Sequence, residues 1–381
     1  MQPGTDPPVR VLGPNDARAL AGRSGTDARV DRLFARVGRT PGMDSLAIVG
    51  AGAAGAAAAY RLRDSDRDVT VFEKSRGVCG RAATRRNAGC HYDYGANYVK
   101  PGDGPVGELL RDLGGDGLVT VEEPVWTFDG DGDIAPGRDG DEPKYTWETG
   151  VTQLAKRLFS RTDANVRKET RVETLARTQD GWTLADTDAR RFGEFDDVLL
   201  TPPAPQTADL LADAHWEDDR RRALRAAAAE VPYRSIVTVV LHYPFELDRE
   251  WYGLVNTDDA HDVGWLSREA CKDGHVPGGE ELLVVQMAPE WSAEHYDAGA
   301  SEQTAAAAEH AASLLADDRL LEPDWTDIQG WRYALPDEGV DPAPVAAARE
   351  AGLHVAGDWV AGAARVHAAV ESGLAAADEI R

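Results

Sequence analysis

Three glycines and one acidic residue near the start of the chain have the types and spacing that a nucleotide site requires. Gly50, Gly52 and Gly55 stand in SLAIVGAGAAG, and Glu73 follows in DVTVFEK. The first glycine permits a tight turn, the second lets the backbone approach a pyrophosphate, and the third lets a helix pack on a strand. A carboxylate at Glu73 can accept hydrogen bonds from a ribose diol and would repel a 2′-phosphate, which argues against NADP here. The alternative is an alanine-rich core helix with incidental glycines.

A second candidate segment, SRGVCGRAATRR, follows Glu73 directly. Gly77, Gly80 and Arg81 form a loop able to wrap a phosphate and the edge of a flavin. The alternative is an ordinary solvated basic loop.

The other half of the site is expected far along the chain, in HVAGDWVAGAARVHAAVESG. Asp358 follows a short strand and could bond a ribityl hydroxyl. A helix beginning near Val366 offers N-terminal amides that can stabilise negative charge on a flavin pyrimidine. NAD dehydrogenases do not need this returning element, whereas flavoproteins do. The alternative is a C-terminal core helix preceded by a turn.

These residues need elements that hold them in place. Residues 45–49, 53–64 and 68–74 are typical of a strand, a helix and a second strand, which form a βαβ unit with a parallel sheet. Residues 105–115, 150–160 and 204–230 are expected to be helical, and 166–186 to form strands around a turn at Gln179–Gly181. Tryptophan-bearing strands are expected over 234–245, 262–269, 281–291 and 327–336, forming an antiparallel sheet against a helix at 300–318.

The predicted domain organisation is interleaved. We expect an N-terminal extension over 1–42, with Met43 a candidate native start. The nucleotide domain is expected over 43–100, 149–230 and 341–381, and the substrate domain over 101–148 and 231–340.

Composition limits the classes of function. The chain has 381 residues, with 41 Lys and Arg against 66 Asp and Glu, a net charge of −25. Such a surface repels phosphate backbones, so we expect no nucleic-acid partner. Only six of the bases are Lys, and this balance favours a halophilic protein; the alternative is an acidic protein from a GC-rich genome. Three cysteines without metal spacing, no secretory signal and no membrane span indicate a cytoplasmic protein.

The combined segments resemble the renalase-like branch of the FAD-dependent amine oxidase superfamily over roughly residues 45–380. The resemblance rests on IVGAGAAG, VFEKSRGVCGRAATRR, DYGANYV, WETGVTQLAKRL, VLLTPPAPQ, GWLSREACKDG, WRYALP and VAGDWVAGAARVHAAVESG. It implies a Rossmann-type FAD-binding domain with an inserted, mainly antiparallel-sheet domain, like that of para-hydroxybenzoate hydroxylase. It also implies non-covalent FAD that is reoxidised by dioxygen.

The resemblance carries functional positions onto this chain. Gly50, Gly52, Gly55, Glu73, Arg81 and Asp358 match cofactor positions, and Val172 matches the place where backbone groups meet the adenine. Family members often have a Gln where Asn97 stands and a Phe where Val99 stands. These two differences mean that the family's substrate does not carry over directly to this pocket. The superfamily's amine oxidases bring a Lys close to the flavin through water. Lys272 is the candidate here, and the alternative is a solvent-exposed Lys after a strand.

The substrate pocket is expected to have aromatic walls. The candidates are Tyr98, Trp265, Trp331 and Tyr333, each of which could instead be an ordinary core aromatic. A covalent link of FAD to Cys90 or His91 is not expected, and no metal-ligand spacing is evident.

The sequence therefore predicts an FAD-dependent oxidoreductase acting on a small molecule with dioxygen. The resemblance implies a dihydronicotinamide as the hydride donor, and flat aromatic side chains, on which a planar ring can stack, give this partial support. The net charge of −25 favours a cationic amine instead. An amine oxidase, an NAD-dependent dehydrogenase, an enzyme that uses no oxygen and a flavin-binding protein without turnover remain as alternatives.

Overall fold

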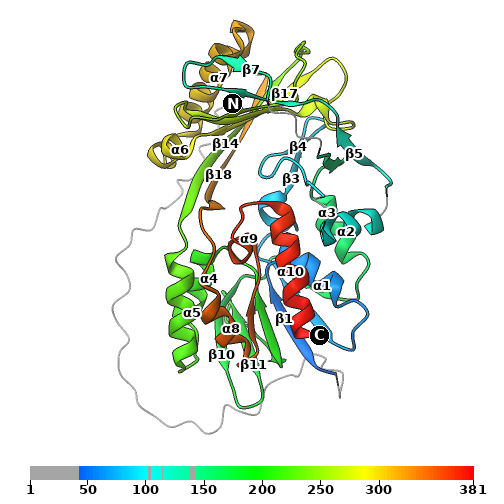
Figure 1. The fold of residues 1–381 in the computed structure, drawn as a ribbon, viewed down its shortest axis with the longest axis vertical. Helices are drawn as coiled ribbons and strands as arrows, with labels where there is room; N and C mark the ends of the chain where they lie inside the picture. The colour runs from blue at the N-terminus through cyan, green and yellow to red at the C-terminus, as the bar shows by residue number, and fades with distance from the viewer. Residues whose placement is uncertain (1–42, 102–103, 114, 138–141) are drawn as a thin grey trace, which may run out of the picture. The chain divides into compact units, whose positions relative to one another are not determined.

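The computed structural model of the protein describes residues 43–101, 104–113, 115–137 and 142–381 (Figure 1). The predicted extension over residues 1–42 lies outside the described residues.

A parallel five-stranded sheet carries the glycine motif. Its apolar strands include SLAIV, which is buried at all five positions. All four strand pairs of this sheet run parallel. The C-terminal strand Leu353–Val355 returns to this sheet next to Asp197–Leu200, which in turn pairs with Ser45–Val49. The strand order is β19 (Leu353–Val355), β13 (Asp197–Leu200), β1 (Ser45–Val49), β2 (Asp68–Phe72) and β9 (Asn165–Arg167).

Helices cover one side of this sheet, and those at Ala53–Arg61 and Val366–Ile380 are rich in alanine, whose small side chain allows close approach. A Cβ added to Gly373 would lie 2.2 Å from the Ala54 carbonyl oxygen, so the C-terminal helix packs directly on the helix after the glycine turn. The helices in this core cluster are α1 (Ala53–Arg61), α2 (Pro105–Leu113), α3 (Gln153–Phe159) and α10 (Val366–Ile380).

A second core cluster involves the other side of this sheet. It includes Trp182, Trp216 and Trp359. The predicted turn at Gln179–Gly181 is confirmed, because the strands on either side of it pair in antiparallel fashion. The predicted helix over 204–230 is two helices, with a break at 213–218. The elements of this region are β10 (Val172–Arg177), β11 (Trp182–Asp186), β12 (Arg191–Phe195), α4 (Ala204–Ala212), α5 (Asp219–Glu230) and α8 (Pro342–Arg349).

The second large sheet has seven strands and is mainly antiparallel, with one parallel pair between β6 and β15. Helices α6 (Pro289–His295) and α7 (Ala300–Leu315) pack on it. The strand predicted over 281–291 ends at Met287, because Pro289 begins α6. The order is β18 (Trp325–Pro336), β14 (Tyr233–Tyr243), β17 (Glu281–Met287), β16 (Val263–Arg268), β15 (Gly253–Asn256), β6 (Val125–Phe128) and β7 (Ile134–Ala135).

Two short antiparallel pairs complete the sheet structure. One is the hairpin of β3 (Thr84–Asn87) and β4 (Cys90–Asp93); the other pairs β5 (Leu118–Val121) with β8 (Lys144–Trp147). Cys90 and Tyr92 of the hairpin pack against Val240, Leu282 and Val284 of the large sheet. The predicted fold class, a Rossmann-type parallel sheet with a mainly antiparallel sheet, is confirmed. Among the described residues, no helix is both long and apolar enough to cross a bilayer.

Candidate functional site

The glycine turn has the geometry that its spacing predicts. Gly50 has φ +105°, and a Cβ there would lie 2.4 Å from Thr201 Oγ1. A Cβ at Gly55 would lie 2.1 Å from the Gly50 carbonyl oxygen, so only glycine allows this approach of helix and turn. A Cβ at Gly52 would meet no described atom within 4 Å. Gly52 is the N-cap residue of α1, and no described side chain caps this helix end. An anionic group therefore fits over this turn, at the positive end of α1.

Glu73 is fixed beside the glycine turn. Its side chain is held by two backbone amides: Ala51 N–H donates to Oε2 at 2.8 Å, and Ser75 N–H donates to Oε1 at 2.7 Å. The residue is 7% exposed. A carboxylate with two fixed amide donors keeps lone pairs for further hydrogen bonds, which is what a ribose diol requires.

The loop after Glu73 folds back onto the glycine turn. Cys79 N–H donates to the Ala51 carbonyl oxygen at 2.8 Å, and Gly52 forms an isolated parallel bridge with Cys79. Cys79 adopts φ +81°, an unusual conformation for a residue with a Cβ. The loop is therefore built against the nucleotide turn rather than being a plain solvated loop.

Arg81 connects three distant segments. Its guanidinium forms a bidentate pair with Asp358, with both N···O distances 2.8 Å, and also donates to the Ala334 carbonyl oxygen at 2.9 Å. Its own carbonyl oxygen accepts from Ala96 N–H at 3.0 Å. A Cβ at Gly95 would lie 2.0 Å from that oxygen. Sequence reasoning placed Arg81 and Asp358 separately on the cofactor, and the structure pairs them with each other.

The C-terminal half lies where a strand gives way to two helices. Asp358 begins the short α9 (Asp358–Ala361), after Gly357 with φ +154°. Val366 is the first residue of α10 and is half-buried, and no side chain of the described residues caps this helix. Val172 begins β10 and packs in the same core cluster as Phe72, the residue before Glu73.

The predicted aromatic residues form separate contacts. The rings of Tyr98 and Trp265 are 6.4 Å apart, and Tyr252 joins them at 6.1 and 6.0 Å. Sequence reasoning missed Tyr252, which has no local signal. Trp331 stacks instead on Tyr94 at 5.1 Å, and Tyr333 lies edge-on to Tyr233 at 5.8 Å.

Trp265 and Trp331 nevertheless belong to one face of the seven-stranded sheet. Trp265 pairs with Gln286, which pairs through Thr238 with Gln329. Trp331 stands two residues beyond Gln329, and alternation along a strand puts both on the same side. Gln286 Nε2 donates to the Gly95 carbonyl oxygen at 2.6 Å, which ties this face to the segment next to Arg81.

Lys272 is 1% exposed, so the solvent-exposed alternative is wrong. Its Nζ lies 3.1 Å from Asp93 Oδ2, 2.7 Å from Glu269 Oε1 and 2.8 Å from the Asn97 carbonyl oxygen. Burial lowers the pKa of Lys272, but the charges of Asp93 and Glu269 outweigh burial and raise the pKa above its ordinary value. Burial raises the pKa of Asp93, but the charges of Lys272 and His275, together with hydrogen bonds from Thr84 and Val151, lower it below its ordinary value.

His275 completes this buried network. Nε2 lies 3.0 Å from the Trp147 carbonyl oxygen, which can only accept, so Nε2 carries a proton. Nδ1 lies 2.8 Å from Glu269 Oε2. Through Glu269, His275 is therefore linked to Lys272 and Asp93 in one buried network. Sequence reasoning missed Asp93, Glu269 and His275; the spacing of Glu269 and Lys272 was the available signal.

The two departures from the family pattern lie beside this network. With its amide oriented to satisfy its neighbours, Asn97 donates to the Asp93 carbonyl oxygen and accepts from Trp265 Nε1, both at 3.3 Å. Val99 is fully buried, and its backbone pairs with Tyr145. Asn97 thus joins the buried charges to the aromatic cluster.

The cysteines lie away from the glycine turn or point into the core. Cys90 is buried under the large sheet, Cys79 Sγ faces the Val151 carbonyl oxygen at 3.9 Å, and Cys271 Sγ lies 4.0 Å from the Trp251 carbonyl oxygen. Burial raises the pKa of Cys90 to about 11. The Nδ1 atom of His91 lies 3.3 Å from the Gly274 carbonyl oxygen.

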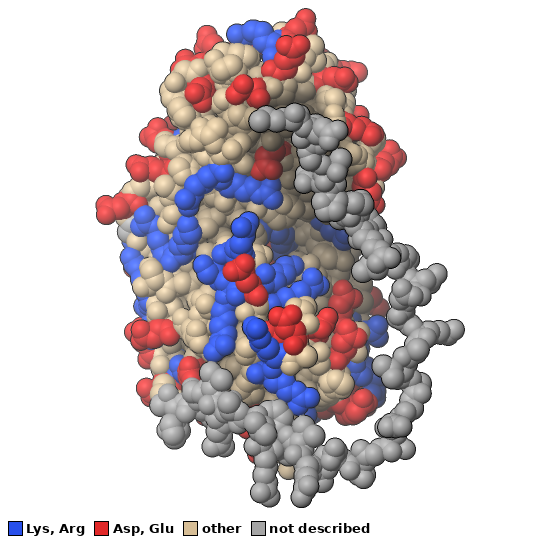
Figure 2. All heavy atoms as spheres, turned by 180° about the vertical axis from the view of Figure 1, so that it is seen from behind, with Lys and Arg blue, Asp and Glu red and all other residues tan. Residues whose placement is uncertain are grey.

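Positive charge is concentrated despite the net charge of −25. Figure 2 shows Lys and Arg gathered on one face of the molecule, whereas Asp and Glu are spread more widely over that view. Burial lowers the pKa of Lys156, and the nearby positive charges of Arg86 and Lys168 lower it further. Burial likewise lowers the pKa of Lys74, which interacts with Glu73 and Arg171.

Comparison with known proteins agrees with this arrangement. Residues 48–113 match an NAD(P)-binding Rossmann-like domain, and residues 122–381 match the flavin-containing amine oxidoreductases. Protoporphyrinogen oxidase 2 of Arabidopsis thaliana is 44% identical over 69 residues, 18% of this chain and 14% of that protein. A Mycobacterium tuberculosis protein named as a flavin-containing monoamine oxidase is 32% identical over 169 residues, 44% of this chain. That match spans 34% of the relative, so the chain matches only a minor part of either protein.

Solved structures share the fold at low identity. A protein from Exiguobacterium sp. 255-15, named for protoporphyrinogen oxidase, has a TM-score of 0.72 at 18% identity, covering 89% of this chain and 99% of that chain. Cyclohexylamine oxidase from Brevibacterium oxydans has a TM-score of 0.67 at 15% identity, covering 89% and 98%. The family match over residues 122–381, more than half of the chain, shows that this protein belongs to the flavin-containing amine oxidoreductase family and is a flavoenzyme that uses FAD.

Proposed function

We propose that this protein is an oxidase that takes a hydride from a small reduced substrate and passes the electrons to dioxygen. The position of Arg81 carries the proposal. Its side chain holds Asp358, and its backbone holds Ala96. Arg81 therefore joins three segments: the loop against the glycine turn, the C-terminal segment at Asp358 and the aromatic region. FAD is an extended dinucleotide with its reactive ring at the far end, so its site must be built from segments that come together in this way.

Named residues supply each part of this site. Gly52 and the start of α1 would hold the pyrophosphate, Glu73 the ribose, and the backbone at Val172 the adenine. Asp358 and the start of α10 at Val366 would lie along the ribityl chain and the ring. FAD, when bound, supplies the hydride acceptor and reduces dioxygen to hydrogen peroxide. We propose that FAD binds without a covalent link, since Cys90 is buried in the core and Cys79 and Cys271 each face a backbone carbonyl oxygen.

We further propose that the interleaved domains expected from the sequence hold, with one adjustment. Val106, Leu109 and Leu110 of α2 share a core with α1 and α10. Residues 105–113 therefore belong with the nucleotide domain, and the substrate domain begins after them.

Lys272 is proposed to be a positioning residue. Its ammonium has three N–H donors, and three oxygens lie around it. It therefore holds Asp93 and the backbone of Asn97, and Asn97 in turn contacts Trp265.

The substrate is proposed to be a dihydronicotinamide, in keeping with the renalase-like branch. Trp265 and Trp331 offer flat faces on the same side of the large sheet, suited to a planar ring. The buried acids Asp93 and Glu269 are already paired with Lys272, so neither is free to bind a cationic amine. An amine is the second candidate, favoured by the family match over residues 122–381.

The test begins with the purified full chain. We expect the protein to carry a flavin that absorbs at about 450 nm. Denaturation should release this flavin, and adding a donor in air should produce hydrogen peroxide. Absence of flavin after expression with added riboflavin would overturn the proposal. Flavin that remains with the denatured chain would overturn only the non-covalent attachment.

A further inference from the structure

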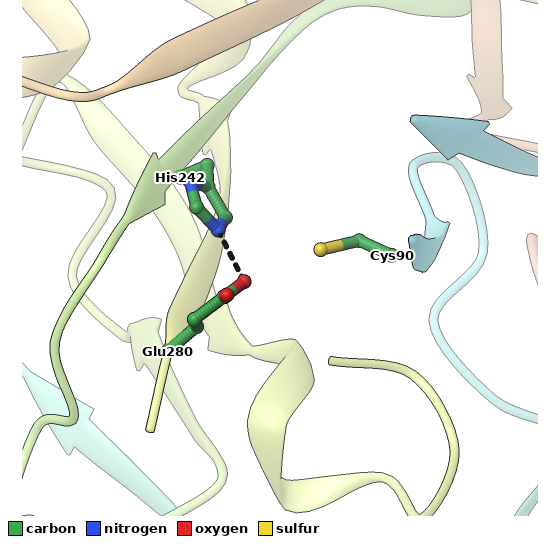
Figure 3. A group of neighbouring side chains, drawn as sticks. All are labelled: Cys90, His242 and Glu280. Carbon is green, nitrogen blue, oxygen red and sulfur yellow. Dashed lines mark hydrogen bonds and ion pairs between the residues drawn. The ribbon is translucent and has the colours of Figure 1, made fainter. Parts of the chain in front are cut away.

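A second cluster of side chains lies away from the proposed cofactor site. Cys90 begins β4, His242 stands near the end of β14, and Glu280 immediately precedes β17. Figure 3 shows the Cys90 sulfur pointing toward the imidazole of His242 and the carboxylate of Glu280. The hairpin β3–β4 and two strands of the large sheet therefore contribute one side chain each.

The three side chains are close enough to share a ligand. His242 Nε2 lies 2.9 Å from Glu280 Oε2, and the potential ligand atoms of all three residues lie within 4.8 Å of one another. Cys90 is fully buried and His242 is 4% exposed, whereas the Glu280 side chain is 34% exposed. The cluster is thus closed on the sulfur and imidazole side and open to solvent through the carboxylate.

The imidazole of His242 is held in one orientation. It stacks on Trp325 with ring centres 4.9 Å apart and an angle of 10° between the planes. Nδ1 lies 3.6 Å from Asp324 Oδ2 and has no hydrogen-bond partner among the described residues. A histidine with one nitrogen toward a ligand set and the other toward a carboxylate is the usual arrangement around a bound metal.

We propose that Cys90, His242 and Glu280 bind a divalent zinc ion, with water in the fourth position. Thiolate sulfur, imidazole nitrogen and carboxylate oxygen are the donor types that Zn²⁺ takes in tetrahedral sites. The ion's two positive charges balance one thiolate and one carboxylate, so the largely buried site is neutral. Binding replaces the proton of the Cys90 thiol, which leaves to solvent as the sulfur–zinc bond forms.

Such an ion would fasten the hairpin to the sheet. Thr238 of β14 lies opposite Gln286, which in turn lies opposite Trp265. His242 is four residues further along β14, so it lies about 13 Å from Thr238. The ion would therefore stand outside the proposed ring site. Asp93, at the other end of β4, anchors Lys272. The inferred role is structural, and it does not depend on which substrate the enzyme oxidises.

The experiment uses the full chain after chelator treatment and dialysis. Co²⁺ is added as the probe, and the spectrum of the metal-free protein is subtracted so that flavin bands cancel. We expect a thiolate-to-cobalt charge-transfer band and, with Zn²⁺, one tightly held ion per chain by elemental analysis. Cys90→Ser should lose the band, and Cys271→Ser, the matched control, should keep it.

A second pair of variants covers the case in which Cys90→Ser does not fold. Glu280→Gln changes a partly exposed ligand, and Asp324→Asn changes the group behind the imidazole. Each should weaken zinc binding by about tenfold or more while circular dichroism stays unchanged. A folded wild-type protein that holds no stoichiometric zinc, or a cobalt band that persists in Cys90→Ser, would overturn the proposal and leave a plain His–Glu pair beside a thiol.

Discussion

At the scale of single residues, Glu73 offers a test of the adenosine end of the site. Glu73→Ala removes a buried carboxylate held by Ala51 and Ser75. A charge-assisted bond contributes about 1.5–3 kcal/mol, so FAD affinity should fall by roughly tenfold or more. Titration of apoprotein with FAD measures this, and Glu108→Ala, on the exposed face of α2, is the control. Unchanged affinity would place the adenosine elsewhere.

The pair of Arg81 and Asp358 should act as a unit. Arg81→Lys loses the bidentate geometry, and Asp358→Asn loses the charge. Each single variant should weaken FAD retention, and the double variant should lose less than the sum, with a coupling of about 0.5–3 kcal/mol. FAD affinities of the four proteins give this coupling directly. Full additivity would mean that the two residues contact the cofactor independently.

The buried network predicts how stability depends on pH. Asp93 has a lowered folded-state pKa, so its contribution is present above the unfolded value of about 3.9 and is lost as pH falls through the folded value. Lys272 has a raised pKa, so its contribution is present below about 10.4 and is lost as pH rises through the folded value.

Lys272→Met removes the cation from this network and should cost about 3–5 kcal/mol at neutral pH, because the buried Asp93 carboxylate then loses its ion-pair partner. The cost should shrink as pH falls, since Asp93 can then take up a proton. Urea unfolding at neutral and mildly acidic pH measures this. Lys168→Met, at an exposed position, is the control. An equal cost at both pH values would contradict the role assigned to Lys272.

At the scale of elements, the contact between α1 and α10 depends on Gly373. A Cβ there would lie 2.2 Å from the Ala54 carbonyl oxygen, so Gly373→Ala forces two helices apart. We expect a loss of about 1–3 kcal/mol in the free energy of unfolding. Gly278→Ala is the matched control, because its Cβ would meet no described atom within 4 Å. Equal stability of the two variants would show that the helices can separate freely.

Elements with strong local signals could be predicted from the sequence. The turn from Gly50 to Gly55 and the return after Leu353 each combine a hydrophobic run with a glycine signal, and the strand ending at Phe72 has a hydrophobic run alone. The strand at Asn165–Arg167 was not resolved from its neighbours, because three residues carry no periodicity. The break after α4 was also missed, because alanine and charged residues favour helix on both sides.

The site was harder to predict than the fold because its contacts join distant segments. Glu73 and the glycines lie within one βαβ unit, where a motif specifies them. Arg81 and Asp358 are 277 positions apart, and nothing local indicates that they pair. The grouping of Cys90, His242 and Glu280 likewise depends on a hairpin packing on a separate sheet.

At the scale of the whole molecule, the net charge of −25 predicts a response to salt. Repulsion between like charges is screened over about 3 Å at 1 M salt, so the melting temperature should rise from low to molar KCl. On the face drawn in Figure 2, Lys and Arg side chains gather together, so charge is unevenly distributed there. Differential scanning calorimetry over this range is the measurement. A flat or falling curve would contradict the halophilic interpretation.

The proposed reaction is tested most directly by mixing the flavin-bound protein with donors in the absence of oxygen. Dihydronicotinamides, including isomeric forms, are compared with a panel of primary and secondary amines, and flavin absorbance near about 450 nm is followed. We predict rapid bleaching by a dihydronicotinamide and recovery of absorbance with peroxide formation when air is admitted. Bleaching by an amine alone would contradict the proposed substrate and establish an amine oxidase, and no bleaching by any donor would contradict the proposed hydride transfer.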